Sequence, residues 1–239
     1  MLLPAEFFEL NLAFARRVAA LTGLSLAEAL RGFTYIYLSF NLPRDFDAAH
    51  PVWRAYLAGL EVAGDPAGWT AGFYRQRQLE APKPLPELEF GCFSYSEWDG
   101  GRMRIHFRAN DAFGISPLSR ERLPVRLEEL AGLFRHIRSH AAHLTSVVGG
   151  SWLYHLPAYR RLFPPAFLAS AAVGEGDAQF FTLWGQFIDH TGQVKPALAQ
   201  EFHQALENQT SLAGLLACFP YSVLRVEGPV EAFYAFYGV

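Results

Sequence analysis

Three prolines within eight residues divide the sequence into two parts with different hydrophobic periods. The segment 80–87 reads EAPKPLPE, with prolines at positions 82, 84 and 86. Proline fixes its own φ and lacks a backbone N–H, so this spacing favours extended backbone and interrupts both a helix and a central strand. The sequence therefore predicts a boundary here, between a helical part, residues 1–80, and a second part, residues 88–239.

Apolar residues before this boundary recur every three to four positions, which is the period of an α-helix. Ser25 followed by Glu28 matches the capping box that opens a helix. Asp65-Pro66 places a capping residue before a proline at the first helical position. We expect four helices in residues 1–80. Each apolar stripe needs a partner, so these helices should pack on one another and on the second part.

The pattern after the boundary changes to alternation of apolar and polar residues, which is typical of strands. The segments LEFGCFSYSEW and RMRIHFRAN flank Asp99-Gly100, a strong signal for a two-residue hairpin turn. Such a turn sets the following opposite pairs: Tyr95 with Arg104, Phe93 with His106, and Gly91 with Arg108. The basic residues of the second strand then share one face, with Phe93 and Tyr95 beside them. This face is either an anion cradle with an aromatic wall or an ordinary exposed sheet surface.

The remainder of the second part mixes helix and strand patterns. A regular apolar stripe predicts a long helix over 121–143. Strands are expected at 144–149, 166–173, 178–188, 221–227 and 230–237, and shorter helices near Pro157 and at Pro196. The predicted class is α+β or α/β, with the N-terminal helical part packed on a C-terminal mixed β-sheet with flanking helices in one globular unit.

The segment 144–165, LTSVVGGSWLYHLPAYRRLFPP, concentrates groups that suit a small anionic ligand. A glycine pair permits close approach of backbone, aromatic rings supply flat surface, and arginines supply forked donors. The candidate ligand-binding residues, including those of the hairpin, are Arg104, His106, Arg108, Trp152, Arg160 and Arg161. His155 beside Tyr154 is the candidate catalytic pair, because histidine titrates near neutral pH. In the alternative interpretation, these aromatic residues simply close the core.

Three histidines on the long helix have spacing that suits metal ligands. His136, His140 and His143 lie at i, i+4 and i+7, so they share one face. No HExxH motif accompanies them, and a partly solvated helix flank explains the same pattern. We treat them as weak candidates and expect no bound metal. No motif identifies a cofactor.

Charge and composition bear on partners and location. A net charge of −3 argues against non-specific nucleic-acid binding, which requires a basic surface. Two cysteines cannot form a disulfide framework and suit a reducing compartment, and no apolar run reaches the length of a membrane span. We therefore expect a cytoplasmic protein without membrane contact, and a homo-oligomer stays open.

The sequence is compatible with three candidate functions. The first is a small-molecule enzyme or binding protein with a phosphate- or carboxylate-bearing ligand, with group transfer as one reaction class. The order of hairpin, long helix, strand and helix is loosely similar to that of GNAT acetyltransferases. The RxxGxG/A loop of that family is absent, so the similarity assigns no residue. The alternatives are a non-catalytic protein-interaction module and a metal-dependent hydrolase that uses the helix histidines.

Overall fold

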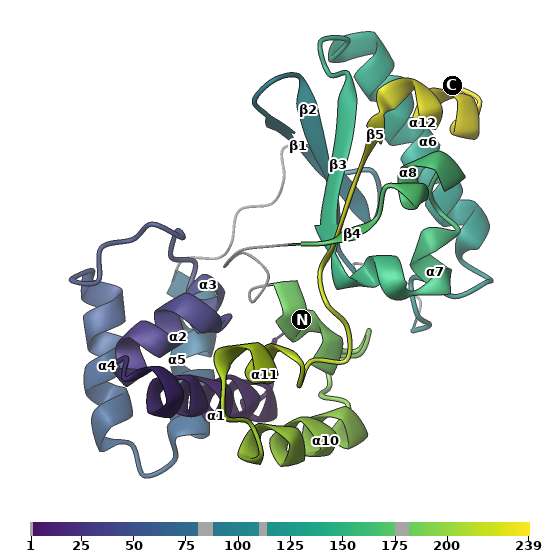
Figure 1. Cartoon of the computed structure of the whole chain (residues 1–239). Coiled ribbons are helices and arrows are strands. Elements are labelled where there is room, and N and C mark those ends of the chain that lie inside the picture. The colour runs from purple at the N-terminus through teal and green to yellow at the C-terminus, as the bar shows by residue number, and fades with distance from the viewer. Residues whose placement is uncertain (1, 81–87, 110–113, 175–181) are drawn as a thin grey trace. The chain divides into compact units, whose positions relative to one another are not determined.

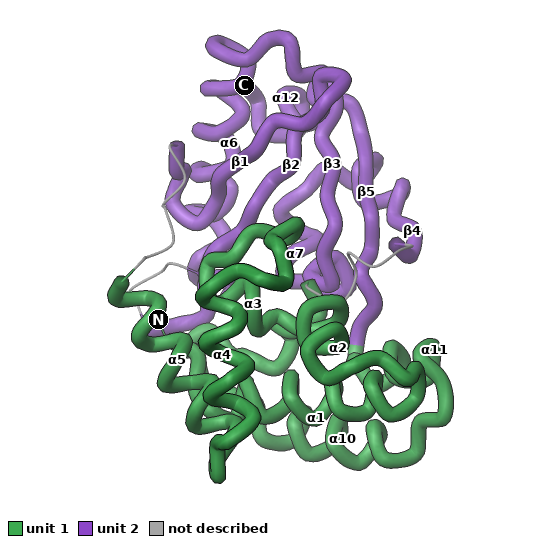
Figure 2. Tube along the Cα trace, turned by 90° about the vertical axis from the view of Figure 1, so that its left-hand side faces the viewer, with its two compact units in different colours: residues 1–84, 176–220 green, residues 85–175, 221–239 purple. Residues whose placement is uncertain are grey.

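The chain forms two compact units, each built from two segments of sequence. The structure is a computed structural model that describes residues 2–80, 88–109, 114–174 and 182–239 (Figure 1). One unit comprises Met1–Pro84 with Gly176–Pro220, and the other comprises Leu85–Glu175 with Tyr221–Val239 (Figure 2). The first unit is helical and the second is built on a sheet, which makes the protein α+β. Residues 182–220, which the sequence prediction included in the second part, belong to the helical unit in this division.

Within the described residues, the helical unit contains five helices in residues 1–80, where the sequence predicted four, and further helical segments from later in the chain. Their bounds are α1 Ala5–Thr22, α2 Leu26–Phe33, α3 Ile36–Ser39, α4 Pro51–Val62, α5 Pro66–Glu80, η2 Trp184–Phe187, α10 Pro196–Glu207 and α11 Leu212–Leu216. The capping box is confirmed: the Ser25 side chain accepts from the Glu28 N–H, and the Glu28 carboxylate accepts from the Ser25 N–H at 2.8 Å. Proline opens α4, α5 and α10, as the sequence predicted for α5 and α10.

An aromatic cluster explains why the later segment joins this unit. The fully buried Trp184 ring lies 5.5 Å from Phe14 of α1, 5.9 Å from Phe202 of α10 and 5.1 Å from Phe219. The expected strand over 178–188 is therefore wrong where the structure describes it, because residues 182–187 are helical. A short run that is apolar throughout suits a buried helix as well as a buried strand, and packing decides between them.

The second unit contains a five-stranded mixed sheet in the order β1-β2-β3-β5-β4. The strands are β1 Phe93–Trp98, β2 Arg102–Phe107, β3 Ser146–Ser151, β4 Ala172–Val173 and β5 Leu224–Pro229. The helical segments are α6 Leu123–His140, η1 Trp152–His155, α7 Pro157–Arg160, α8 Pro165–Ala169 and α12 Val230–Tyr237. β2 and β3 pair in parallel, and the long helix α6 makes the crossover between them. The other pairs are antiparallel.

Helices of this unit cover one face of the sheet (Figure 1). Met103 and Val147 are fully buried on that face, where α6 and α12 meet through stacked Phe134 and Phe233 rings 4.7 Å apart. The predicted long helix is thus confirmed as α6. Residues 230–237 were expected to form a strand, and this is wrong because they form α12. Val230 and Phe233 are its buried residues, a spacing of three that belongs to a helix, although aromatic and β-branched residues favour strands.

The hairpin exists, but its turn is one residue longer than predicted. Trp98 pairs with Arg102, so Asp99, Gly100 and Gly101 form a three-residue loop. Gly100 and Gly101 both have positive φ, 74° and 70°, which suits glycine and allows this loop. The predicted opposite pairs are therefore wrong.

The correct register determines which face of β1 is buried. The observed pairs are Phe93 with Phe107, Ser94 with His106, Tyr95 with Ile105, and Ser96 with Arg104. Phe93 and Tyr95 hence belong to the core face with Ile105, and not beside the basic residues. The core face of β2 carries Met103 and Ile105, which belong to the hydrophobic core, and Phe107, which packs against it.

A buried ion pair joins α6 to the start of the hairpin. Arg126 is 2% exposed and contacts the Glu129 carboxylate at 2.8 Å, and its guanidinium also donates to the Cys92 sulfur. The same carboxylate accepts a hydrogen bond from the Cys92 N–H at 3.1 Å. Gly91 has a φ of 60°, and a Cβ there would overlap the Glu129 side chain. Glycine at 91 therefore allows the carboxylate to reach the strand.

Candidate functional site: the polar face of the sheet

The face of the sheet opposite its helices carries a group of cationic side chains. We call it the polar face. Its residues, which follow from strand alternation and register, are Ser94, Ser96, Trp98, Arg102, Arg104, His106, Ser146, Val148, Gly150, Arg225 and Glu227. Four of them are arginine or histidine and one is acidic. The Glu227 carboxylate accepts a hydrogen bond from the Ser146 hydroxyl at 2.9 Å.

The Trp98 ring contacts the guanidinium groups of two of these arginines. It is 46% exposed and lies directly opposite Arg102. The guanidinium carbons of Arg102 and Arg104 lie 6.0 Å and 5.6 Å from the centre of its ring. A guanidinium over an indole face is held by the ring quadrupole. The two cations are therefore kept side by side on the protein surface despite their mutual repulsion.

Arg104 also reaches across to the next strand. Its Nη2 donates to the Gly150 carbonyl at 3.0 Å. A Cβ at Gly150 would meet only this Nη2 atom, at 3.6 Å, so the polar face has open space above the glycine. Arg225 is the residue that pairs with Gly150 on β5. Gly150 thus lies between two strands that each contribute an arginine to the same face.

The Cβ position of the neighbouring Gly149 faces the opposite, helix-covered side of the sheet. A Cβ there would overlap the Tyr154 hydroxyl and come within 2.7 Å of Val226 Cγ2. Tyr154 is 2% exposed, and burial raises the pKa of its phenol. Its hydroxyl bonds to Tyr159, and its ring packs among buried aromatic residues. The structure therefore places this candidate catalytic hydroxyl beneath the sheet, on the helix-covered face.

His155 and Trp152 gather around one exposed ring. The His155 ring stacks on Tyr221 at 5.1 Å, and its Nε2 lies 3.1 Å from the Ser222 carbonyl oxygen. Trp152 is nearly parallel to the same Tyr221 ring, at 6.2 Å and 7°. The two candidates thus belong to an aromatic stack that begins one residue after β3 ends.

The remaining candidate arginines make local contacts. Arg161 donates to the carbonyl oxygens of Leu118 and Ser119 at 2.6 Å and 2.8 Å, and so holds the loop before α6. Arg160 donates to the Tyr154 carbonyl at 3.3 Å. Arg108 forms an ion pair with Glu89 at 3.2 Å. None of these contacts joins the three arginines to the polar-face arginines.

The three candidate histidines do not converge on one point, and His143 lies outside the helix because α6 ends at His140. The His136 and His140 rings stack at 4.6 Å, whereas His143 Nε2 bonds to the Glu97 carboxylate at 2.9 Å. Within the described ranges, no group of three or more histidine, cysteine, aspartate or glutamate side chains is arranged to hold a metal ion. In the same ranges, no helix combines the length and the apolar character needed to cross a bilayer.

Sequence reasoning missed three aromatic or cationic residues of this face, Trp98, Arg102 and Arg225. The signal for the first two was Gly101, since a DGG loop moves the strand ends to Trp98 and Arg102. Arg225 had no local signal, because its place beside Gly150 follows from a strand pair separated by more than seventy residues. His106 lies on the polar face as expected, with its Nε2 2.8 Å from the Ser96 hydroxyl.

Comparison with known proteins gives no assignment. No family model, no curated protein and no solved structure matches the chain.

Proposed function

We propose that the protein binds a small anionic molecule, bearing a phosphate or a carboxylate, on the polar face beside Gly150. The observation that carries the proposal is Arg104, whose guanidinium lies against Trp98 and borders the space above Gly150. A planar guanidinium in a defined orientation forms paired charge-assisted hydrogen bonds with these anions.

The charges of the surrounding residues favour an anion over a cation. Arg102 and Arg225 add positive charge to the same face, and His106 adds more when it is protonated. Glu227 is the acidic residue of this face, and its carboxylate accepts from Ser146. Such a field attracts anions over a distance of about 8 Å at physiological ionic strength.

The proposal concerns binding, with Arg104 as its central residue. Tyr154 lies beneath Gly149 and does not enter it. Trp152 follows Gly150 by two residues, so its ring is the candidate for covering an apolar part of the ligand. Group transfer and the role of His155 stay predictions, which require a ligand to be identified first.

Isothermal titration calorimetry of the full chain with inorganic phosphate, pyrophosphate and citrate tests the proposal. Arg104→Ala should weaken binding about tenfold or more, because each hydrogen bond to a charged group contributes roughly 1.5–3 kcal/mol. Gly150→Val should abolish binding by filling the space above the glycine. Arg135→Ala is the matched control, since this exposed arginine of α6 pairs only at the surface with Glu128.

Two results would count against the proposal. One is an absence of binding by all three anions, which would favour the interaction module and lead to a search for a protein partner. The other is equal loss in Arg104→Ala and Arg135→Ala, which would show a non-specific charge effect.

A further inference from the structure

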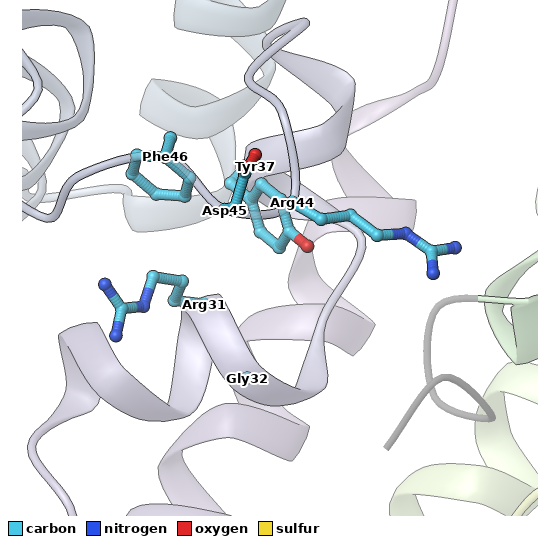
Figure 3. Close-up of a pocket in the computed structure, with 6 residues that line it drawn as sticks. All are labelled: Arg31, Gly32, Tyr37, Arg44, Asp45 and Phe46. Atoms are coloured by element: carbon cyan, nitrogen blue, oxygen red, sulfur yellow. The ribbon is translucent and has the colours of Figure 1, made fainter. Parts of the chain in front are cut away.

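A second candidate site lies in the helical unit, far along the sequence from the polar-face residues. It is a depression of about 370 Å³. Its lining residues come from the end of α2, from α3 and from the loop after α3: Arg31, Gly32, Tyr37, Arg44, Asp45 and Phe46 (Figure 3). This volume lies in the range of small-molecule sites, about 300–1,000 Å³.

The local backbone explains how these residues meet. After α3 the chain turns at Asn41, which has a φ of 62°, and the Leu42 N–H bonds back to the Tyr37 carbonyl. This turn brings residues 44–46 over the end of α2. Gly32 lies there without any atom within 4 Å of the position a Cβ would take. A glycine therefore leaves space open at the base of the depression.

Packing holds the aromatic wall of the depression in place. The Phe46 ring lies 5.2 Å from Tyr37 and 5.5 Å from Trp53, and all three residues are at most 6% exposed. The Arg31 guanidinium carbon lies 6.0 Å from the centre of the Phe46 ring. Phe46 lines the depression, so the exposed part of its ring is held in a fixed position there.

The charged residues that line the depression are Arg31, Arg44 and Asp45. Arg31 and Arg44 extend to opposite sides of the depression, and the Tyr37 hydroxyl points toward α2 between them (Figure 3). Burial raises the pKa of Tyr37, while Arg44 and Arg31 act in the opposite direction. The phenol is therefore neutral at pH 7 and adds no negative charge to the depression.

We propose that this depression binds a small organic monocarboxylate with an aromatic or aliphatic body. The lining carries two arginines and one aspartate, a net charge of +1, which matches a single negative charge better than a phosphate dianion. The Arg31 guanidinium binds the carboxylate, and the apolar body lies against the Phe46 ring above Gly32. The proposal is independent of the polar-face site, which belongs to the other unit.

The test compares phenylacetate with its neutral analogue phenylacetamide on the full chain, by saturation-transfer NMR and calorimetry. Gly32→Leu should fill the base of the depression and weaken phenylacetate binding about tenfold or more, which corresponds to about 1.4 kcal/mol. Gly72→Leu is its matched control, because Gly72 is also a helical glycine with open space around its Cβ position. Arg31→Ala should weaken phenylacetate binding and leave that of phenylacetamide unchanged.

The outcomes are distinct from those for the polar face. Arg104→Ala should leave phenylacetate binding intact. The proposal is overturned if phenylacetamide binds as tightly as phenylacetate, if Gly32→Leu binds like the wild type, or if neither compound binds at all.

Discussion

Adding one methyl group within the Gly149-Gly150 pair should lower stability at position 149 but not at position 150. The two residues face opposite sides of β3. A Cβ at Gly149 would overlap the Tyr154 hydroxyl and lie 2.7 Å from Val226 Cγ2, both in the core. A Cβ at Gly150 would meet only the far end of the flexible Arg104 side chain, at 3.6 Å. The pair therefore supplies its own control for the effect of alanine on strand backbone.

The expected magnitudes follow from these contacts. Overpacking a core by one carbon costs about 1–3 kcal/mol, whereas alanine in place of glycine inside a strand is favourable by about 0.5–1 kcal/mol. Gly149→Ala should therefore lower the free energy of unfolding by about 1–2 kcal/mol. Gly150→Ala should leave it unchanged or raise it by a few tenths to about 1 kcal/mol.

Differential scanning calorimetry and urea unfolding monitored by fluorescence measure both variants. For a chain of this size, a loss of 1 kcal/mol lowers Tm by about 2–4 °C. Tyr154→Phe in the Gly149→Ala background should recover part of the loss, because it removes the overlapping oxygen. Equal Tm values for Gly149→Ala and Gly150→Ala, or the absence of recovery in the double variant, would refute this account of the pair.

Three further predictions concern stability. Gly91→Ala should destabilise the sheet unit by about 2–4 kcal/mol, because alanine is strained at this positive φ and its Cβ would overlap the Glu129 side chain. A midpoint of urea unfolding equal to that of the wild type would contradict this. Glu129→Ala should cost about 3–5 kcal/mol because it leaves the Arg126 charge buried without its carboxylate, and a Tm within 1 °C of the wild type would show that the pair matters little. Hydrogen bonds from Ser25 lower the pKa of Glu28 below its ordinary value of 4.5, so the stability from this cap is present above pH 4.5 and is lost as the pH falls through the lowered pKa. Glu28→Gln should therefore flatten the acid part of the pH profile of Tm. An unchanged profile would rule the cap out as a source of acid sensitivity.

The sequence predicted those helices and turns that are determined by residues close together in the chain. The capping box at Ser25, the prolines that open α5 and α10, the long stripe of α6 and the turn after Trp98 all act within a few residues, so each is visible in the sequence.

The candidate site was only partly predictable. Alternation along β2 showed that Arg104 and His106 share a face, but it cannot show which residues lie opposite them. That depended on one extra loop residue, Gly101, which moved Tyr95 into the core and brought Trp98 beside the arginines. The roles of Arg160 and Arg161 were equally hidden, because a guanidinium suits backbone carbonyls as well as an anion.

The sequence by itself determined the local elements, the change of period at the prolines and the polar alternation of the hairpin, because these depend on residues close together in the chain. Tertiary structure alone decided that Trp184 fills the helical core, that residues 230–237 form a helix, and that Arg225 flanks Gly150. The physical reason is the same in each case. An apolar or cationic side chain is compatible with several conformations, and the contact that selects one comes from a residue far away in the sequence.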